Sequence, residues 1–214
     1  MCVLALAGCA KKHNAHVPPV RLPYTPMSGE TGLASWYGHP YNGRPAADGE
    51  IYDMETMVAA HRTLPFGTLV RVTNLANART VDVRIIDRGP FIEGRIIDLS
   101  HAAAERIDLV GPGVAQVRLD ILSTPPAGEG ATQFAVQVGA FADRGRADQI
   151  RSAMEQRYGS ARLGLRHGSP PLWRVLVGQE TNLDSAHQLA QHLEGEVDHC
   201  FVVRLDDATR AAGQ

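Results

Sequence analysis

The first half of the chain alternates apolar and polar residues over short segments, a pattern typical of strands with one buried face. The alternation runs through residues 69–73 and 80–86 and returns at 114–122, where Val117, Leu119 and Ile121 are separated by polar side chains. A short helix is predicted over 102–107, with Ser100 as its N-cap. About ninety residues of short strands with many glycines and little helix favour a compact barrel over a doubly wound sheet.

The second half has a different pattern. Apolar residues alternate over 134–138 and then recur at helical spacing behind Asp143, which is a suitable N-cap. Strands are predicted at 161–166 and 172–177, followed by a helix that Gly195 is expected to end and by a last strand at 200–205. The order β-α-β-β-α-β predicts an α+β sandwich of the ferredoxin-like type.

The sequence begins with an apolar run that ends in Leu-Ala-Gly-Cys at residues 6–9. The run is too short to span a bilayer and lacks the positive first region of a signal peptide. Its last four residues nevertheless resemble the bacterial lipobox, in which the cysteine is acylated and becomes the new N-terminus. Such a short motif also arises by chance in a leader rich in alanine and leucine. A real lipobox would anchor the protein to a membrane through acyl chains on Cys9.

Proline-rich segments separate the predicted regions. Residues 10–29 contain four prolines and no periodicity, and a second segment of this kind follows the barrel. The predicted organisation is a lipoprotein leader at 1–9, a tether at 10–29, a barrel at 30–123, a linker at 124–132, a sandwich at 133–206 and a tail at 207–214.

The composition argues against several classes of protein. The chain has 21 basic and 23 acidic residues and a net charge of -2, which gives no reason to expect a nucleic acid as partner. RNA-binding RRM domains share the β-α-β-β-α-β order, but no strand here has their basic, aromatic-rich pattern. The three cysteines form no CxxC pair, so neither a disulfide framework nor a structural zinc site is indicated. Nothing in the sequence suggests a metal or an organic cofactor.

The candidate chemistry lies between residues 50 and 100. Asp87 directly follows the strand at 80–86, and the Gly89-Pro90 pair behind it ends that strand. A carboxylate in this position is held by a rigid element and remains open to a ligand. The structural alternative is that Asp87 only caps an Asx turn. Asp98 fits a structural role of the same kind.

Six segments of the first half carry a family resemblance, and they include Ala-Ser-Trp-Tyr-Gly at 34–38 and Asp-Arg-Gly-Pro-Phe at 87–91. The others are residues 48–53, 59–67, 70–75 and 95–100. Together they closely resemble the rare lipoprotein A (RlpA) family of septal lytic transglycosylases, which implies a double-psi β-barrel. Residues 134–206 resemble the SPOR domain, which binds septal peptidoglycan that has lost its stem peptides.

The resemblance implies a reaction and the residues for it. RlpA-like enzymes cut the β-1,4 bond between MurNAc and GlcNAc within peptide-free glycan and leave a 1,6-anhydroMurNAc end without using water. By resemblance, Asp87 matches the catalytic aspartate, and Glu50 and His61 match the other positions linked to activity. Our hypothesis makes Asp87 a general acid and then a base, because one carboxyl can play both parts if its pKa is raised. Glu50 would stabilise positive charge at the anomeric carbon, and His61 would hydrogen-bond the substrate or a carboxylate.

Other side chains are candidates for holding the sugar. Those in the barrel are Trp36, Tyr37, Arg88 and Asp98, although a core role for at least one of the two aromatic residues is equally compatible. Those on the exposed sheet face of the second domain are Gln137, Trp173 and Arg174, and burial of Trp173 is the ordinary alternative.

Two residues depart from the family pattern, a difference that loses a hydroxyl, adds a charge and bears on activity. The family usually has Thr-Ala-Asn/Ser-Gly-Glu before the glutamate, whereas this chain has Ala-Ala-Asp-Gly-Glu at 46–50. The extra carboxylate of Asp48 would tend to raise the pKa of Glu50 or Asp87. Expansins, which share the barrel, loosen polysaccharide without cutting it. A septal lipoprotein that binds peptidoglycan without cleavage is therefore the alternative to an enzyme.

The expected location is the bacterial cell envelope. By resemblance to enteric sorting rules, the two lysines at 11 and 12 favour anchoring to the outer membrane through Cys9, with the protein facing the periplasm and enriched at the septum. The expected partners are peptide-free glycan strands and this membrane, with division-site proteins as further candidates.

Overall fold

A computed structural model of the chain describes residues 29–126, 132–166 and 170–205. The first domain is a closed barrel with the strand order β1-β5-β2-β4-β3-β6. Its strands are β1 (Glu30–Tyr37), β2 (Val58–His61), β3 (Leu69–Asn74), β4 (Thr80–Asp87), β5 (Arg95–Ser100) and β6 (Val114–Ser123). The barrel that the sequence predicts is thus confirmed.

The alternation of side chains explains the barrel's core. In β3 and β4 every second residue is buried, including Val70, Val72, Val83 and Ile85, and the residues between them face outward. The helix α1 (His101–Arg106) covers one end, and the Ser100 hydroxyl caps it by accepting a hydrogen bond from the Ala103 amide at 3.3 Å. The predicted N-cap is therefore confirmed.

The pairing of the strands brings two acidic residues to the same neighbour. Strands β2 and β4 are parallel, and Ala60 pairs with Asp87. Strands β2 and β5 are antiparallel, and Ala60 pairs with Asp98 on its other side. Because neighbouring strands lie about 4.8 Å apart, the two aspartates flank Ala60 with roughly 10 Å between their Cα atoms.

The second domain has the predicted ferredoxin-like order. Its elements are β7 (Phe134–Phe141), α2 (Arg144–Tyr158), β8 (Ala161–Arg166), β9 (Leu172–Glu180), α3 (Leu183–Leu193) and β10 (Phe201–Arg204). The sheet order is β10-β7-β9-β8. Asp143 caps α2, as expected, by accepting from the Arg146 amide at 2.6 Å. Gly195, the predicted stop of the next helix, directly follows the C-cap of α3. Helix α3 ends at Leu193 and its C-cap Glu194 stays in the right-handed region, where no glycine is needed.

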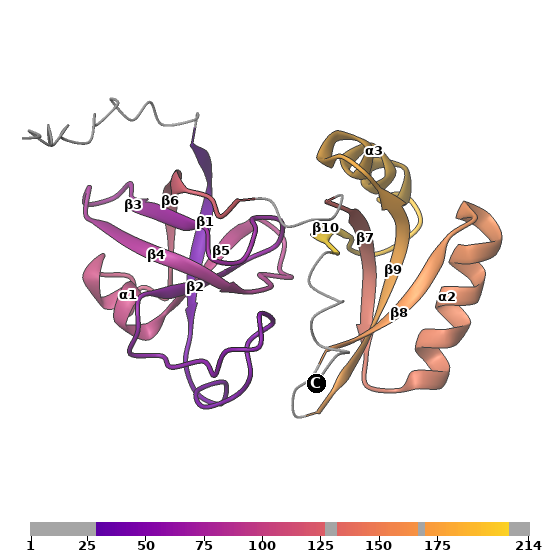
Figure 1. Cartoon of the computed structure of the whole chain (residues 1–214), viewed down its shortest axis with the longest axis horizontal. Coiled ribbons are helices and arrows are strands. Elements are labelled where there is room, and N and C mark those ends of the chain that lie inside the picture. Colours follow the sequence, from indigo (N-terminus) through magenta and orange to yellow (C-terminus); the bar gives the residue numbers. More distant parts are fainter. Residues whose placement is uncertain (1–28, 127–131, 167–169, 206–214) are drawn as a thin grey trace, which may run out of the picture.

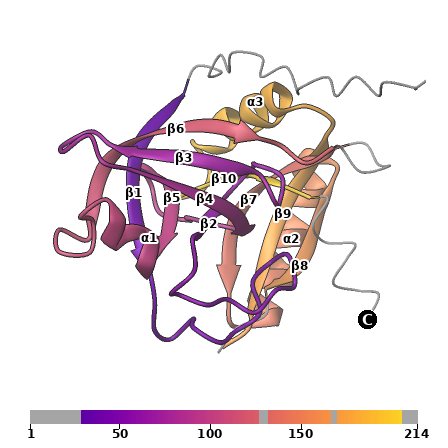
Figure 2. The ribbon, with the colours of Figure 1, turned by 60° about the vertical axis from the view of Figure 1, so that its left-hand side comes forward.

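The two faces of this sheet have different neighbours. Helices α2 and α3 cover one face, where Val136, Val175 and Val177 form the main core of the domain. On the other face, Leu176 and Val203 belong to a smaller buried cluster that contacts Phe91 of the barrel. Figures 1 and 2 show the sheet beside the barrel with α2 on its far side. The domains therefore meet through the segment that follows Asp87.

The predicted leader, most of the tether, much of the linker and the tail lie outside the described residues, and with them Cys9. Within the described ranges, no helix is both long and apolar enough to cross a membrane.

Candidate active site

Asp87 is held by the backbone at the end of β4. Its Oδ1 atom accepts hydrogen bonds from the amides of Arg88 at 2.7 Å and Ala47 at 3.1 Å. Oδ2 makes no hydrogen bond to any residue that the structure describes. Burial raises the pKa of this carboxyl, and the two backbone hydrogen bonds and nearby arginines oppose the shift without cancelling it. Asp87 therefore holds a proton more readily than an ordinary aspartate does.

Asp98 is a second largely buried carboxyl on the other side of Ala60. The Ser35 hydroxyl donates to its Oδ1, and Arg95 Nη1 donates to the same hydroxyl at 2.5 Å. Burial raises the pKa of Asp98 as well, against the effects of Ser35 and Arg95. A side chain at Gly89 would meet Asp98 Oδ2 at 3.7 Å, and the φ of 153° at Gly89 disfavours any residue with a Cβ. The turn after Asp87 thus passes directly over Asp98.

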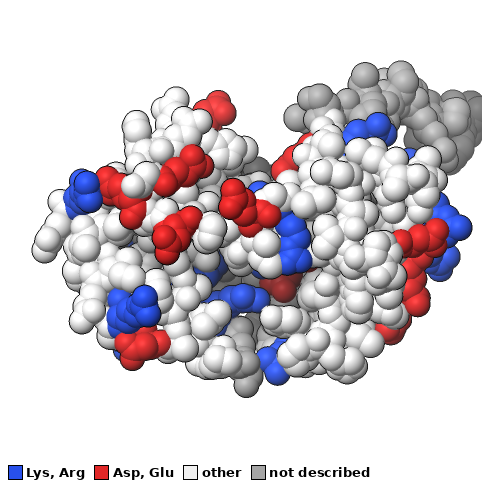
Figure 3. Space-filling view, turned by 180° about the vertical axis from the view of Figure 1, so that it is seen from behind, with Lys and Arg blue, Asp and Glu red and all other residues white. Residues whose placement is uncertain are grey.

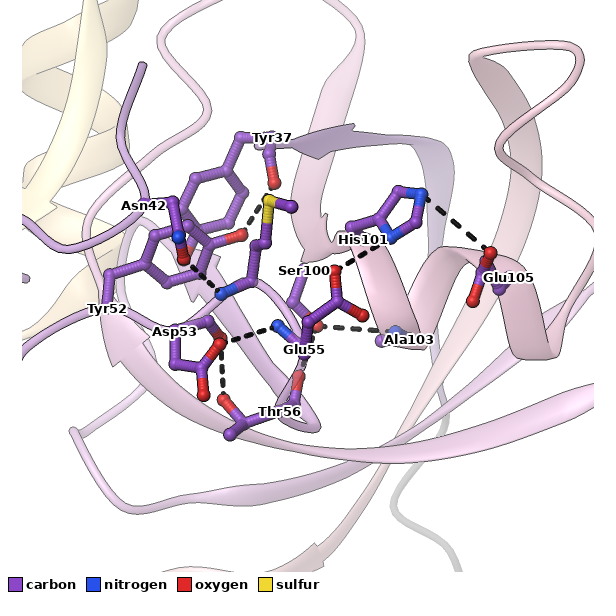
Figure 4. Close-up of polar contacts among 11 residues, drawn as sticks. Tyr37, Asn42, Tyr52, Asp53, Glu55, Thr56, Ser100, His101, Ala103 and Glu105 are labelled. Carbon is purple, nitrogen blue, oxygen red and sulfur yellow. Dashed lines mark hydrogen bonds and ion pairs between the residues drawn. The ribbon is translucent and has the colours of Figure 1, made fainter. Parts of the chain in front are cut away.

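Tyr37 adds a neutral hydroxyl to this group. Its ring stacks on Tyr52 with the centroids 4.2 Å apart, and the Tyr52 hydroxyl donates to the Tyr37 carbonyl at 2.6 Å. Figure 4 shows the two rings face to face. The Tyr37 hydroxyl is buried and has no hydrogen-bond partner within the described part of the chain. Burial, followed by the charge of Asp87, raises the pKa of Tyr37, so its proton stays available for a hydrogen bond.

The Tyr37 hydroxyl, which has no hydrogen-bond partner among the described residues, gives a testable prediction. Tyr37→Phe should lower the rate of cleavage by about tenfold if the hydroxyl bonds the substrate, since a hydrogen bond contributes ~1 kcal/mol or more. The stability should stay the same or rise, because the change removes a buried polar group without a partner. Rates on glycan and urea unfolding curves would measure the two effects. Tyr41→Phe is the matched control, because Tyr41 is 44% exposed. An equal loss of activity in both variants would contradict a role for the Tyr37 hydroxyl.

The segment that contains Asp48 and Glu50 folds over the end of β4. The Asp48 amide donates to the Ile86 carbonyl at 3.1 Å, next to the bond from Ala47 to Asp87. The Glu50 side chain is 53% exposed and makes two hydrogen bonds to Arg84, at 2.8 and 2.7 Å. These bonds lower the pKa of Glu50. The side chain of Asp48 is only 10% exposed, and burial raises its pKa. Asp48 is thus the more enclosed carboxyl with a raised pKa, and Glu50 is the more exposed one with a lowered pKa.

Polar contacts fix the rest of this segment to α1 (Figure 4). Asn42 accepts from the Met54 amide at 2.9 Å, and the Ser100 hydroxyl donates to the Thr56 carbonyl at 2.5 Å. Glu55 lies 3.2 Å from His101 Nδ1. The long connection between β1 and β2 is therefore held by hydrogen bonds at two places, the end of β4 near Asp87 and the start of α1.

The ring of His61 faces away from Asp87. Its Nδ1 accepts from the amides of Thr63 and Leu64 at 3.2 and 3.1 Å, which places the proton on Nε2, 3.1 Å from Glu30. Burial lowers the pKa of His61, so it is neutral at pH 7. Among the described residues, the ring has no hydrogen bond to Asp87, Asp98 or Glu50. The structure thus gives His61 a carboxylate partner, but that partner is Glu30.

Comparison with known protein families matches both domains. The family described as lytic transglycolase matches residues 29–119, and the SPOR domain matches residues 130–204. The chain belongs to the RlpA family. It is 46% identical over 116 residues to the endolytic peptidoglycan transglycosylase RlpA of Vibrio cholerae, a match that covers 51% of this chain and 44% of the relative.

Two further RlpA relatives match the barrel region. The protein of the same name from Campylobacter jejuni is 51% identical over 96 residues, which is 44% of this chain and 35% of the relative. The one from Pasteurella multocida is 55% identical over 91 residues, which is 42% of this chain and 31% of the relative. The matched part is therefore less than half the length of each of these relatives.

Two other residues predicted from the RlpA resemblance, Trp36 and Arg88, are packed into the barrel. Trp36 points opposite to Tyr37, packs on the barrel core and meets His101 edge to face at 5.3 Å. Arg88 is 6% exposed, lies 3.7 Å over the Phe66 ring and donates to the His61 carbonyl at 3.1 Å. Both side chains therefore belong to the framework of the site.

The three sheet residues predicted for glycan binding lie on two different faces of the sheet. Gln137 and Arg174 lie on the face away from the helices, and Gln137 is 4% exposed. Trp173 lies on the helix side, where the Arg144 guanidinium sits 4.8 Å from its ring centroid. Of the three candidates, only Gln137 and Arg174 are on the face that turns towards the barrel.

Sequence reasoning missed three residues that shape this RlpA site. Ser35 hydrogen-bonds Asp98, Arg84 holds Glu50, and Glu30 holds His61. Ser35 could have been found from its spacing, because it lies two residues before Tyr37 and so faces the same side of β1. The partnerships of Arg84 and Glu30 depend on contacts across the barrel that no local pattern reveals.

Proposed function

We propose that this chain is an endolytic peptidoglycan transglycosylase that acts on glycan strands lacking stem peptides. The observation that carries the proposal is Asp87, a largely buried carboxyl of raised pKa whose free oxygen lies at the edge of a site with Asp98 and the Tyr37 hydroxyl. Membership of the RlpA family supports the substrate.

The proposed reaction needs one proton donor that later becomes an acceptor. Protonated Asp87 donates its proton to the oxygen that links MurNAc to GlcNAc, and the bond from that oxygen to the anomeric carbon breaks. The C6 hydroxyl of MurNAc then attacks the anomeric carbon, and Asp87 takes its proton. The products are a 1,6-anhydroMurNAc end and a GlcNAc end, and Asp87 is protonated again. No second carboxylate is needed to activate water.

The other residues have supporting roles in this proposal. The charge that develops at the anomeric carbon would be stabilised by a carboxylate, and the pair with Arg84, which lowers the pKa of Glu50, favours Glu50 for this role. The Tyr37 hydroxyl would donate to a substrate oxygen. His61, through its bonds to Glu30 and the 63–64 backbone, would fix the loop that carries Arg62 beside the site.

The SPOR domain and Cys9 would determine where the protein acts. The SPOR domain, by its match to residues 130–204, would hold the protein on septal peptidoglycan of the cell envelope. Acylation of Cys9 would tether it to the outer membrane, and division-site proteins are candidate partners.

Release of soluble sugars would separate an enzyme from a binding protein. The full chain should release sugars from amidase-treated peptidoglycan and should also sediment with it. Sedimentation with the glycan and no release would support the non-cutting alternative. Neither binding nor release would refute the proposed substrate.

The rate should depend on pH through Asp87. The acid form starts the reaction, so kcat/KM should be highest where Asp87 is protonated and should fall as the pH rises through its pKa. Because burial raises that pKa, the fall should lie above the ordinary aspartate value of about 3.9. A profile of kcat/KM against pH measures it. A rate that rises through this range as Asp87 ionises would contradict the role of Asp87 as the first acid.

A further inference from the structure

Among the described residues, the contacts between the barrel and the sheet face that turns towards it lie over one half of that face. On the β10 side, Phe91 contacts the buried cluster that includes Leu176 and Val203, and its ring lies 6.0 Å from that of Phe201. The Arg62 guanidinium sits 5.5 Å from the Phe201 ring, and the Arg204 amide donates to the Arg62 carbonyl at 3.3 Å. The barrel thus reaches the sheet through residues next to His61 and Asp87.

The other half of the same face carries three arginines. Arg162 and Arg166 of β8 alternate with residues of the helix side, and Arg174 of β9 pairs with Gly164 between them. A Cβ at Gly164 would lie 3.6 Å from Arg174 Nη2, so the missing side chain leaves room for Arg174 to lie along the sheet. Arg162 and Arg166 have no hydrogen bond or ion pair with another described residue.

One of these arginines, Arg166, acts on the barrel site. The charge of Arg166 acts on both Asp87 and Asp98, where it opposes the effect of burial on their pKa values. Figure 3 shows, from behind, a hollow between the two domains where basic and acidic side chains meet. A cation of the second domain is therefore within electrostatic range of the two carboxyls of the first.

Three cations on one strip suit an anionic ligand better than a neutral sugar. Each MurNAc carries a lactyl group, which is a neutral amide while the stem peptide is attached and a free carboxylate once the peptide is removed. Peptide-free glycan thus has a negative charge on every second sugar. Guanidinium groups bind carboxylates through two parallel hydrogen bonds, a geometry that lysine cannot reproduce.

Resting on the proposed function, we propose that the two domains share one glycan cleft in which Arg166 determines specificity. Arg162 and Arg174 bind lactyl carboxylates along the sheet, and Arg166 binds the one on the MurNAc that lies beside Asp87. Selection for peptide-free glycan then takes place at the point of cutting as well as during docking on the wall.

The test uses the full chain and one chemically matched pair of substrates. These are amidase-treated glycan and the same glycan after its lactyl carboxylates have been converted to amides. The parent should cut the first at least tenfold faster in kcat/KM. Arg166→Gln should lose this preference by slowing only on the carboxylate form, and Arg166→Lys should restore part of it. Arg157→Gln is the control, because Arg157 is 64% exposed on α2 and pairs with Glu196.

Equal rates of the parent on both glycans would overturn the proposal, and so would an equal slowing of Arg166→Gln on both. If the parent cuts neither the carboxylate nor the amide form of the glycan, the proposed function fails. Co-sedimentation of the protein with each form of the glycan then tests the role of Arg166 in binding. Arg166→Gln should bind the carboxylate form at least fivefold more weakly than the parent, with no difference on the amide form. Unchanged binding would overturn it.

A crosslink tests whether the domains cut while docked. Phe91→Cys and Phe201→Cys, combined in a chain without its native cysteines, would be joined by a short bis-maleimide, with each single variant treated in parallel as control. The joined protein should keep at least half of its cleavage rate. Loss of cleavage in the joined protein alone would show that the docked barrel blocks the sheet, and would overturn the shared cleft.

Discussion

Asp87→Asn should reduce the cleavage of peptide-free glycan by at least about a hundredfold, since a positioned general acid contributes 10²–10⁴ in rate. The amide can still accept the hydrogen bonds from Arg88 and Ala47, so the geometry at the end of β4 is kept while the proton is lost. Rates of sugar release measure the effect. Asp82→Asn is the matched control, because Asp82 lies on the same strand and pairs with Arg71 at the surface.

The stability of the same variant distinguishes a catalytic role from a structural one. The pKa of Asp87 is raised in the folded state, so its contribution to stability is complete below the ordinary aspartate pKa and is lost as the pH rises through the folded value. At pH 7 the parent therefore has a buried group that folding disfavours in its ionised form. Asp87→Asn should unfold at the same urea concentration as the parent or at a higher one. A less stable, inactive variant would indicate that Asp87 only caps its turn.

Leu99→Ala should lower the free energy of unfolding by about 2–5 kcal/mol, the range for large-to-small changes in a packed core. Leu99 is fully buried and pairs with Trp36 on β1 and Ala59 on β2. A cavity there would loosen β5 next to Asp98. Urea unfolding at pH 7 measures the change.

The control for this prediction is Leu75→Ala, because Leu75 is 48% exposed. A surface change of this kind usually alters the stability by less than ~0.5 kcal/mol. A loss below about 1 kcal/mol for Leu99→Ala would mean that the barrel core does not depend on β5 as the structure indicates.

Local patterns were enough to predict the fold class, the elements of the second domain and, in the barrel, the helix α1 and the strands β3, β4 and β6. The alternation at 69–73 and 80–86 reflects inward residues such as Val70 and Val83, and the polar caps Ser100 and Asp143 mark real helix starts. Gly195 follows the C-cap Glu194 at the end of α3, although it does not adopt the left-handed conformation that glycine permits there. The family resemblance, which rests on six separate segments, supplied the reaction and the aspartate.

The surroundings of the site residues were beyond sequence reasoning. Asp87 and Asp98 are close because both pair with Ala60, and this depends on the parallel and antiparallel order of the barrel strands. His61 is adjacent to Ala60 in sequence, yet its ring bonds Glu30, because neighbouring residues of a strand face opposite sides. The approach of Arg166 to the site depends on how two domains pack, which no motif within either domain specifies.

The most direct test of the account is to run the reaction on amidase-treated peptidoglycan in oxygen-18 water and to determine the masses of the released sugars. Attack by the C6 hydroxyl of MurNAc predicts 1,6-anhydro ends that contain no oxygen-18. Reducing ends labelled with oxygen-18 would show that water is the nucleophile, and would contradict Asp87 acting as the sole acid and base in a reaction without water.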